Sequence, residues 1–144
     1  MNCIRQFGAL PARKRRLLLR AVALVAAVRI TLWTLPFRWV RSVVGRRRAV
    51  SPALAKLHVE HLTWAVQAAA RRIPGASCLT QAISLQYLMT SAGHEAEVHI
   101  GVAKDAARGF EAHAWVKHRG AVVLGDDGDL ERYAPMLALY PKES

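Results

Sequence analysis

The hydrophobic periodicity of this chain changes once, at Ala92-Gly93, from helical to extended. Three helical regions are expected before that point: Pro11 to about Val44, Ser51-Pro52 to about Arg72, and Cys78 to about Ala92. Three strands are expected after it, at Glu97 to Ala103, Phe110 to His118 and Ala121 to Leu124, with a further turn of helix from Leu130. Helices followed by an antiparallel sheet predict an α+β fold in which the Cys78 helix packs on the sheet.

The length of 144 residues suits one compact domain. Within it we expect a basic, amphipathic helical segment at residues 1–50 and the core at residues 51–144. The two cysteines are poorly placed for a structural disulfide, because Cys3 lies near the terminus and Cys78 opens a helix. Reduced cysteines suit a cytoplasmic protein.

Cys78 is the first candidate for chemistry. It follows the break at Pro74-Gly75 and therefore falls in the first turn of its helix. Free N–H groups and the positive end of the helix dipole favour the thiolate there, and the thiolate is the form that attacks a carbonyl carbon. The alternative is a cysteine packed as a small apolar side chain. A general base near Cys78 would favour the catalytic role over the packing role.

His113 is the candidate base, because the strands on either side of Arg119-Gly120 predict a hairpin. If Arg119-Gly120 is a two-residue turn, Asp126 lies directly opposite His113. Opposed side chains have Cβ atoms about 4.5–5.5 Å apart, so the carboxylate could orient the imidazole. A three-residue turn would place Gly125 there instead and leave Asp127 as the orienting acid. A surface histidine beside an acid-rich turn is the alternative.

Several short motifs follow one another in this half of the chain: Ser77-Cys78-Leu79, Ala92-Gly93-His94, His99-Ile100-Gly101-Val102, Gly109-Phe110-Glu111-Ala112-His113-Ala114-Trp115-Val116 and Tyr133-Ala134-Pro135-Met136. Through them residues 70–137 resemble the lasso peptide leader peptidases of the stand-alone type. The Phe-x-Ala-His-Ala-Trp-Val run is the specific part. The resemblance implies a core like that of transglutaminases and papain-like proteases, with Cys78, His113 and Asp126 as the catalytic triad.

The implied reaction is hydrolysis of one peptide bond in a ribosomally made precursor. Cys78 would be the nucleophile, His113 the general base and acid, and Asp126 the residue that orients the imidazole. The backbone N–H of Cys78 is one candidate oxyanion donor, and Gln81, one turn along, is a guess at another. Trp115 could wall the site against water, or it could simply be a core aromatic.

The resemblance also implies partners. The freed core peptide would pass to an ATP-dependent macrolactam cyclase, and a separate small protein would recognise the leader, because this chain shows no strand-rich N-terminal segment for that task. No cofactor is expected. No metal site is expected either, since the four histidines at 58, 61, 94 and 99 lack clustered cysteine or acidic ligands. The alternatives are another transglutaminase-like acyl-transfer enzyme or amidase, or a basic binding protein without catalysis.

Charge is unevenly distributed along the chain. Residues 1–59 contain thirteen Lys or Arg and no Asp or Glu. The apolar stretch from Leu17 to Val44 is interrupted by arginines and Pro36, whereas a membrane span needs about 20 largely uncharged residues, and it has no clear signal-peptide cleavage site. We expect this region to dock a peptide or protein partner. Contact with a membrane surface ranks below docking, and nucleic-acid binding is not expected, because no helix-turn-helix, zinc pattern or aromatic-bearing strand accompanies the basic runs.

Overall fold

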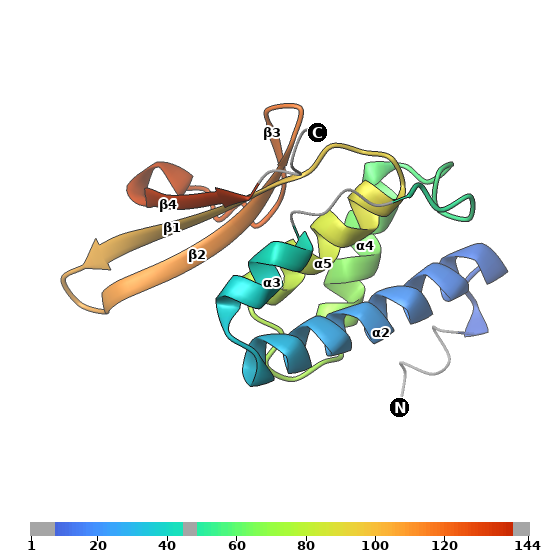
Figure 1. Ribbon diagram of the computed structural model, residues 1–144, viewed down its shortest axis with the longest axis horizontal. Coiled ribbons are helices and arrows are strands. Elements are labelled where there is room, and N and C mark those ends of the chain that lie inside the picture. The colour runs from blue at the N-terminus through green and yellow to red at the C-terminus, as the bar shows by residue number, and fades with distance from the viewer. Residues whose placement is uncertain (1–7, 45–48, 140–144) are drawn as a thin grey trace.

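The computed structural model describes residues 8–44 and 49–139, in which a layer of helices packs against an antiparallel sheet (Figure 1). The helices are α2 (Ala12–Thr34), α3 (Phe37–Val44), α4 (Val59–Ala70) and α5 (Cys78–Ser91). The strands are β1 (Glu97–Asp105), β2 (Gly109–His118), β3 (Ala121–Leu124) and β4 (Ala134–Leu139), with the 3-10 turn η1 (Leu130–Arg132) before β4. The expected α+β fold is thereby confirmed. Cys3 lies outside the described residues.

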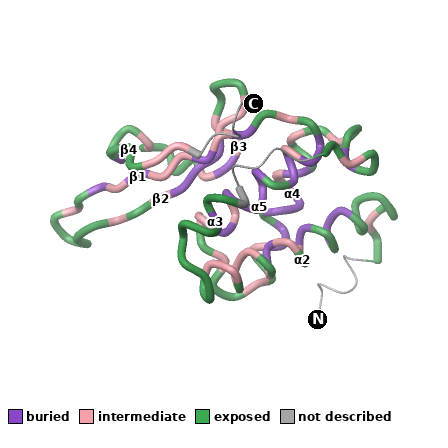
Figure 2. The backbone as a smooth tube through the Cα atoms, viewed as in Figure 1, coloured by how far each residue is buried: buried purple, intermediate pink, exposed green. Residues whose placement is uncertain are grey.

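Helix α5 is the centre of the fold. It packs against α2 and α4 on one side and against β1 and β2 on the other, and nine of its fourteen residues are buried (Figure 2). Apolar residues from all these elements form one core: Leu18 and Val25, Leu62 and Val66, Leu85 and Met89, Val98, Val116 and Leu124 are among its members. Burying apolar side chains contributes about 1.5–3 kcal/mol each for residues the size of Val or Leu. We call this set the helical core.

Both ends of α5 are determined by neighbouring residues, and the end at Gly93 is as the sequence predicts. The Ser77 Oγ accepts a hydrogen bond from the Thr80 N–H at 3.3 Å, which caps the first turn. Gly93 follows the last turn with a φ of 84°, a left-handed conformation that glycine adopts without strain. Contacts between neighbouring residues therefore define where α5 begins and ends, independently of its packing against other elements.

The sheet has the strand order β3-β2-β1-β4, and every neighbouring pair is antiparallel. The three predicted strands are confirmed, with β1 and β2 slightly longer than expected. Arg119 and Gly120 form the predicted two-residue turn between β2 and β3: both have positive φ, and His118 pairs with Ala121.

The helix predicted from Ser51 begins later than expected, at Val59. The Ser51 carbonyl accepts the N–H groups of Leu54 and Ala55, so residues 51–56 form a separate turn. The Leu57 carbonyl is then bound by the His94 side chain at 2.8 Å. That bond comes from beyond the end of α5, and no local pattern around Ser51 could predict it.

Strand β4 is an element that the sequence did not predict. It pairs with β1 at the edge of the sheet, and the register is irregular between Ile100 and Gly101. Pro135 lies opposite Gly101 in this pair. Proline lacks an N–H for the ladder and usually indicates a non-strand, but an edge strand or a bulge tolerates it.

Pro36 separates α2 from α3, as the interruption in the pattern indicated. The buried side of α2 belongs to the helical core through Leu17, Leu18, Ala21 and Val25. By length and composition, α2 is also apolar enough to cross a membrane, with a mean hydropathy of 1.8 over eighteen residues of which 28% are buried. Core helices of soluble proteins and signal sequences share these properties.

Replacing the capping hydroxyl of α5 tests its local definition. We expect Ser77→Ala to lower the free energy of unfolding by about 1 kcal/mol, because the Thr80 N–H loses its acceptor. Chemical denaturation measures this change. Thr34→Ala is the control, since its exposed hydroxyl only bonds back to Ile30 within α2, and it should change stability by less than about 0.5 kcal/mol. Equal effects of the two substitutions would contradict the assigned cap.

Candidate active site

Cys78 occupies the first position of α5, as predicted. Its side chain is partly buried and packs against the helical core. The first intrahelical backbone bond of α5 is made by Gln81, whose N–H reaches the Ser77 carbonyl at 3.0 Å. The N–H groups of Cys78 and Leu79 therefore have no partner within the helix, and they are suited to stabilise an oxyanion beside the sulfur.

His113 lies on β2, whose side chains alternate between the two faces of the sheet. Ala114 and Val116 are buried in the helical core. Trp115 is buried in a second cluster with Ala103 and Tyr133, which we call the outer-face cluster. His113 shares the face of Trp115 and not that of Ala114.

The imidazole of His113 lies beside two aromatic rings, which are also neighbours of each other. Its centroid lies 5.2 Å from the Tyr133 ring and 6.1 Å from the Trp115 ring, with both pairs close to parallel. Gly101 lies opposite His113 on β1. A Cβ at Gly101 would come within 2.8 Å of Tyr133 and 3.0 Å of Trp115, so this glycine makes room for the stacked rings.

One hydrogen bond determines the tautomer of the neutral His113 ring. Its Nε2 lies 2.6 Å from the carbonyl oxygen of Gly125. A carbonyl can only accept, so Nε2 carries the proton and donates it. In the neutral ring Nδ1 is then left with a lone pair, which is the form required of a general base.

The register that placed Asp126 opposite His113 is wrong. A bulge between β2 and β3 makes Val116 pair with Leu124, one residue further along β3 than a regular hairpin would give. Bulges add one residue to one strand and shift everything beyond them. The reason for preferring Asp126 over its neighbour is therefore removed.

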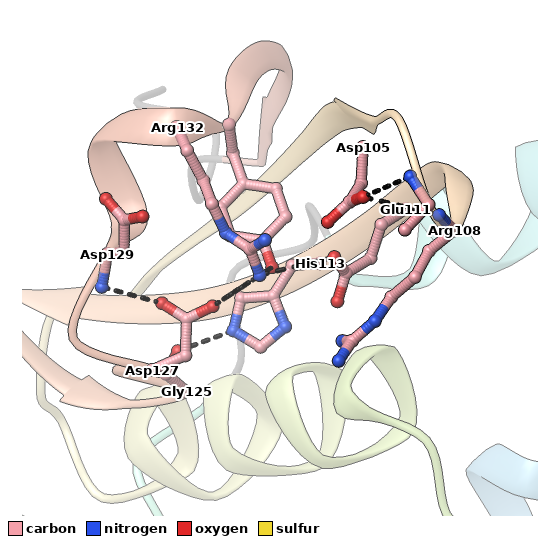
Figure 3. A network of polar contacts seen from close by, with 10 residues as sticks. Asp105, Arg108, Glu111, His113, Gly125, Asp127, Asp129 and Arg132 are labelled. Carbon is pink, nitrogen blue, oxygen red and sulfur yellow. Dashed lines mark hydrogen bonds and ion pairs between the residues drawn. The ribbon is translucent and has the colours of Figure 1, made fainter.

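Asp127 is the carboxylate that lies in a network of polar contacts with Arg132 and Asp129, as Figure 3 shows. The Tyr133 hydroxyl donates to Asp127 Oδ2 at 3.0 Å, and Arg132 Nη2 lies 3.4 Å from the same oxygen. Arg132 also forms an ion pair with Glu111 at 3.2 Å. Asp126, in contrast, accepts the backbone N–H of Gly128 at 2.9 Å in an exposed turn.

The network stabilises the ionised form of Asp127. The pKa of this carboxyl is lowered from 3.8, first by the hydrogen bond from the Asp129 N–H and then by Tyr133, Arg132 and the charge of His113, all acting against desolvation. Desolvation raises the pKa of Tyr133 from 10.0, and its bond to Asp127 adds to the effect. Desolvation would lower the pKa of Arg132, but its carboxylate partners outweigh this and raise it.

Among the described residues, the structure does not join Cys78 and His113 by a polar contact. Cys78 packs against the helical core, and within the described part of the chain it has no hydrogen bond to the imidazole. Gln81 donates its side-chain amide to the Ala76 carbonyl at 3.4 Å. Trp115 is 6% exposed and is a core residue of the outer-face cluster. The catalytic roles assigned to these residues remain predictions.

A family model for the transglutaminase-like superfamily matches residues 12–138, from the start of α2 into β4. The chain belongs to the transglutaminase-like superfamily. This superfamily consists generally of cysteine peptidases and transglutaminases. No curated protein and no solved structure gives a significant match.

In this transglutaminase-like chain, sequence reasoning missed the roles of Glu111, Arg132 and Tyr133. Glu111 lies two residues before His113 and so shares its face, which strand alternation could have shown. Arg132 and Tyr133 come from the segment before β4, whose return to the sheet was not predicted. Among residues 8–44 and 49–139 no three His, Cys, Asp or Glu side chains gather as metal ligands.

The lowered pKa of Asp127 predicts a pH dependence of stability. A carboxyl whose pKa is lower in the folded state contributes stability above its unfolded value of about 4, and loses it as pH falls through the folded value. Asp127→Asn should therefore destabilise the protein most at pH 5–7, and the difference from the native chain should shrink on acidification. Denaturant titrations across this range measure it. A difference that stays constant down to pH 2 would contradict the assignment.

Two glycines with the same φ of 84° test the close packing beneath His113. A Cβ at Gly125 would lie 2.7 Å from the Ala114 carbonyl, whereas a Cβ at Gly128 meets nothing within 4 Å. Gly128→Ala should cost about 1 kcal/mol from backbone strain alone. Gly125→Ala should cost at least about 2 kcal/mol more, because the added carbon must displace β2. Similar losses of stability would contradict the tight contact.

Proposed function

We propose that this protein is a cysteine peptidase that removes the leader from a ribosomally made lasso peptide precursor. Membership of the transglutaminase-like superfamily supports a cysteine-based acyl-transfer reaction. The Phe110–Val116 motif supports the narrower class of substrate. The observation that carries the proposal is the placement of Cys78 and His113 on neighbouring elements. Cys78 begins α5, and α5 packs on β2, the strand that bears His113. In the neutral His113 ring, Nε2 carries the proton and Nδ1 does not.

The proposed reaction proceeds in two steps. Cys78 Sγ attacks the scissile carbonyl carbon while His113 Nδ1 takes the thiol proton, and the imidazolium then protonates the departing amine as the C–N bond breaks. Water next attacks the thioester and gives a proton to Nδ1. The proton returns to sulfur as the C–S bond breaks, which releases the leader as a carboxylic acid that then gives its proton to solvent. The N–H groups of Cys78 and Leu79 stabilise both oxyanions.

The thiol and the imidazole must approach each other for this chemistry. Catalytic hydrogen bonds are often long in free enzymes and tighten when substrate binds. Because α5 already packs on β2 and His113 shares the face of Trp115 and not that of the helical core, we propose that peptide binding reorients the His113 side chain toward the first turn of α5. A shallow open depression lined by Gln67, Ala70, Arg71 and Gln81 adjoins that turn and offers a place for substrate residues.

We assign the support of the imidazolium to Asp127 in place of Asp126. Its negative charge acts on His113, and Tyr133 and Arg132 hold its Oδ2. Gly125 fixes the ring through its carbonyl at the same time. Orientation and charge compensation are thus divided between a backbone group and a carboxylate.

The proposal includes the partners that a stand-alone peptidase needs. A separate small protein would deliver the leader, and an ATP-dependent cyclase would join the freed N-terminus to a side-chain carboxylate. A reducing cytoplasm would keep Cys78 as a thiol. The alternative function is another transglutaminase-like acyl transfer, in which an amine replaces water as the acceptor; the fold accommodates both.

A cleavage assay with the precursor and recognition protein encoded beside its gene tests the proposal. We expect one bond to be cut, read by mass spectrometry, and Cys78→Ala to reduce the rate by at least about 10³-fold because the nucleophile is lost. Asp127→Asn should reduce it by about 10²-fold or more. Asp126→Asn is the matched control and should stay within about threefold.

Three other outcomes of the cleavage assay would contradict the proposal or favour its alternative. An intact precursor in the presence of both reduced proteins would contradict leader removal. Cys78-dependent transfer to an added amine, without hydrolysis, would favour the alternative acyl transferase. A larger loss for Asp126→Asn than for Asp127→Asn would contradict the assignment of the acid.

A further inference from the structure

A group of exposed large apolar residues lies along the segment where α2 ends and α3 begins. We call it the corner patch; its members and their exposed fractions are Ile30 60%, Trp33 80%, Leu35 49%, Phe37 37% and Trp39 58%. Residues 33–39 are all exposed in succession (Figure 2). Soluble proteins rarely leave several large apolar residues together in water without a function for them.

The packing of α3 explains why the patch stays exposed. Among its described side chains, Val40 is the buried one and joins the helical core. Phe37 and Trp39 on the same short helix remain open to solvent. Val40 thus anchors α3 to the protein while its aromatic side chains are left without cover.

The surroundings of the corner patch are exclusively basic in sequence. Arg38 and Arg41 are exposed on α3 beside the aromatic residues. Three more arginines follow at positions 46–48, outside the described residues, and residues 1–59 contain no Asp or Glu. An occupant of this surface must therefore combine an apolar layer with negative charge.

We propose that the corner patch binds the surface of an anionic lipid bilayer. Tryptophan and phenylalanine are favoured at the boundary between headgroups and acyl chains, and arginines beside them pair with lipid phosphates. Each basic residue near an anionic surface strengthens the attraction to it. The patch provides both contributions on one short helix and its adjoining corner.

The binding is peripheral, because α2 stays in the protein. Leu17, Leu18, Ala21 and Val25 are buried in the helical core and would have to leave it if α2 crossed the bilayer. The corner patch, in contrast, can enter the headgroup layer without any change of fold. Figure 1 shows the same corner apart from the β1–β2 hairpin tip, which offers a matched control surface.

Vesicle binding by the full-length protein tests the proposal. The probes are vesicles of phosphatidylcholine with about one third phosphatidylglycerol, and vesicles of phosphatidylcholine alone. We expect at least about tenfold stronger cosedimentation with the anionic vesicles, together with a blue shift of tryptophan fluorescence. The double variants Trp33→Ser/Trp39→Ser and Arg38→Glu/Arg41→Glu should each weaken binding by more than about tenfold.

The controls distinguish binding by the corner patch from nonspecific binding to vesicles. Phe110 is 81% exposed at the hairpin, so Phe110→Ser removes an equally exposed aromatic side chain, and Lys104→Glu/Arg108→Glu reverses two charges there. Both should leave binding within about twofold. Equal binding to the two kinds of vesicle, no binding, or the same loss in the hairpin variants would overturn the proposal. Vesicle-bound protein that resists extraction at high salt and alkaline pH would show α2 inserted and overturn peripheral binding.

Discussion

The burial of α5 between α2, α4 and the sheet is the interaction on which the other features of the structure depend. Small side chains make this possible: Ala65 and Ala69 on α4, Ala82 on α5 and Ala114 on β2 are all buried in the same core, and such residues allow backbones to approach closely. Because β2 turns Ala114 and Val116 toward the helices, strand alternation turns His113 and Trp115 to the other face. The position of the imidazole thus follows from how the helical core is filled.

The parts of the fold that could be predicted from the sequence are those determined by neighbouring residues. Ser77 and Gly93 define the ends of α5 through a side-chain cap and a left-handed turn, and Arg119-Gly120 defines a hairpin. The parts that could not be predicted depend on distant contacts. The late start of α4 depends on a bond from His94 to Leu57, 37 residues earlier, and β4 forms only because β1 offers an edge to a segment that contains Pro135.

In the candidate site, too, the features determined by neighbouring residues could be predicted, and those that depend on distant contacts could not. The residue types and the elements that carry Cys78 and His113 follow from local patterns, and both elements are as predicted. The acid that we propose supports His113 does not follow, because a single bulge after Val116 shifts the register on which the choice of Asp126 rested. Bulges result from strand twist and cross-strand packing, and a register counted from a turn cannot include them. The stacking of His113 on an aromatic ring likewise depends on Tyr133, which lies twenty residues later in the chain, between η1 and β4.

The outermost strands have a consequence for how this protein can meet other chains. β3 has only four residues, and β4 carries a proline in its ladder, so within residues 8–44 and 49–139 both edges of the sheet offer short or interrupted rows of backbone donors. Edges of this kind resist pairing with a further strand and protect a monomer against association into fibrils. An extended peptide will find little support by lengthening this sheet. Side chains displayed by the helices and loops offer an alternative surface for contacts, where sequence can change without disturbing the sheet.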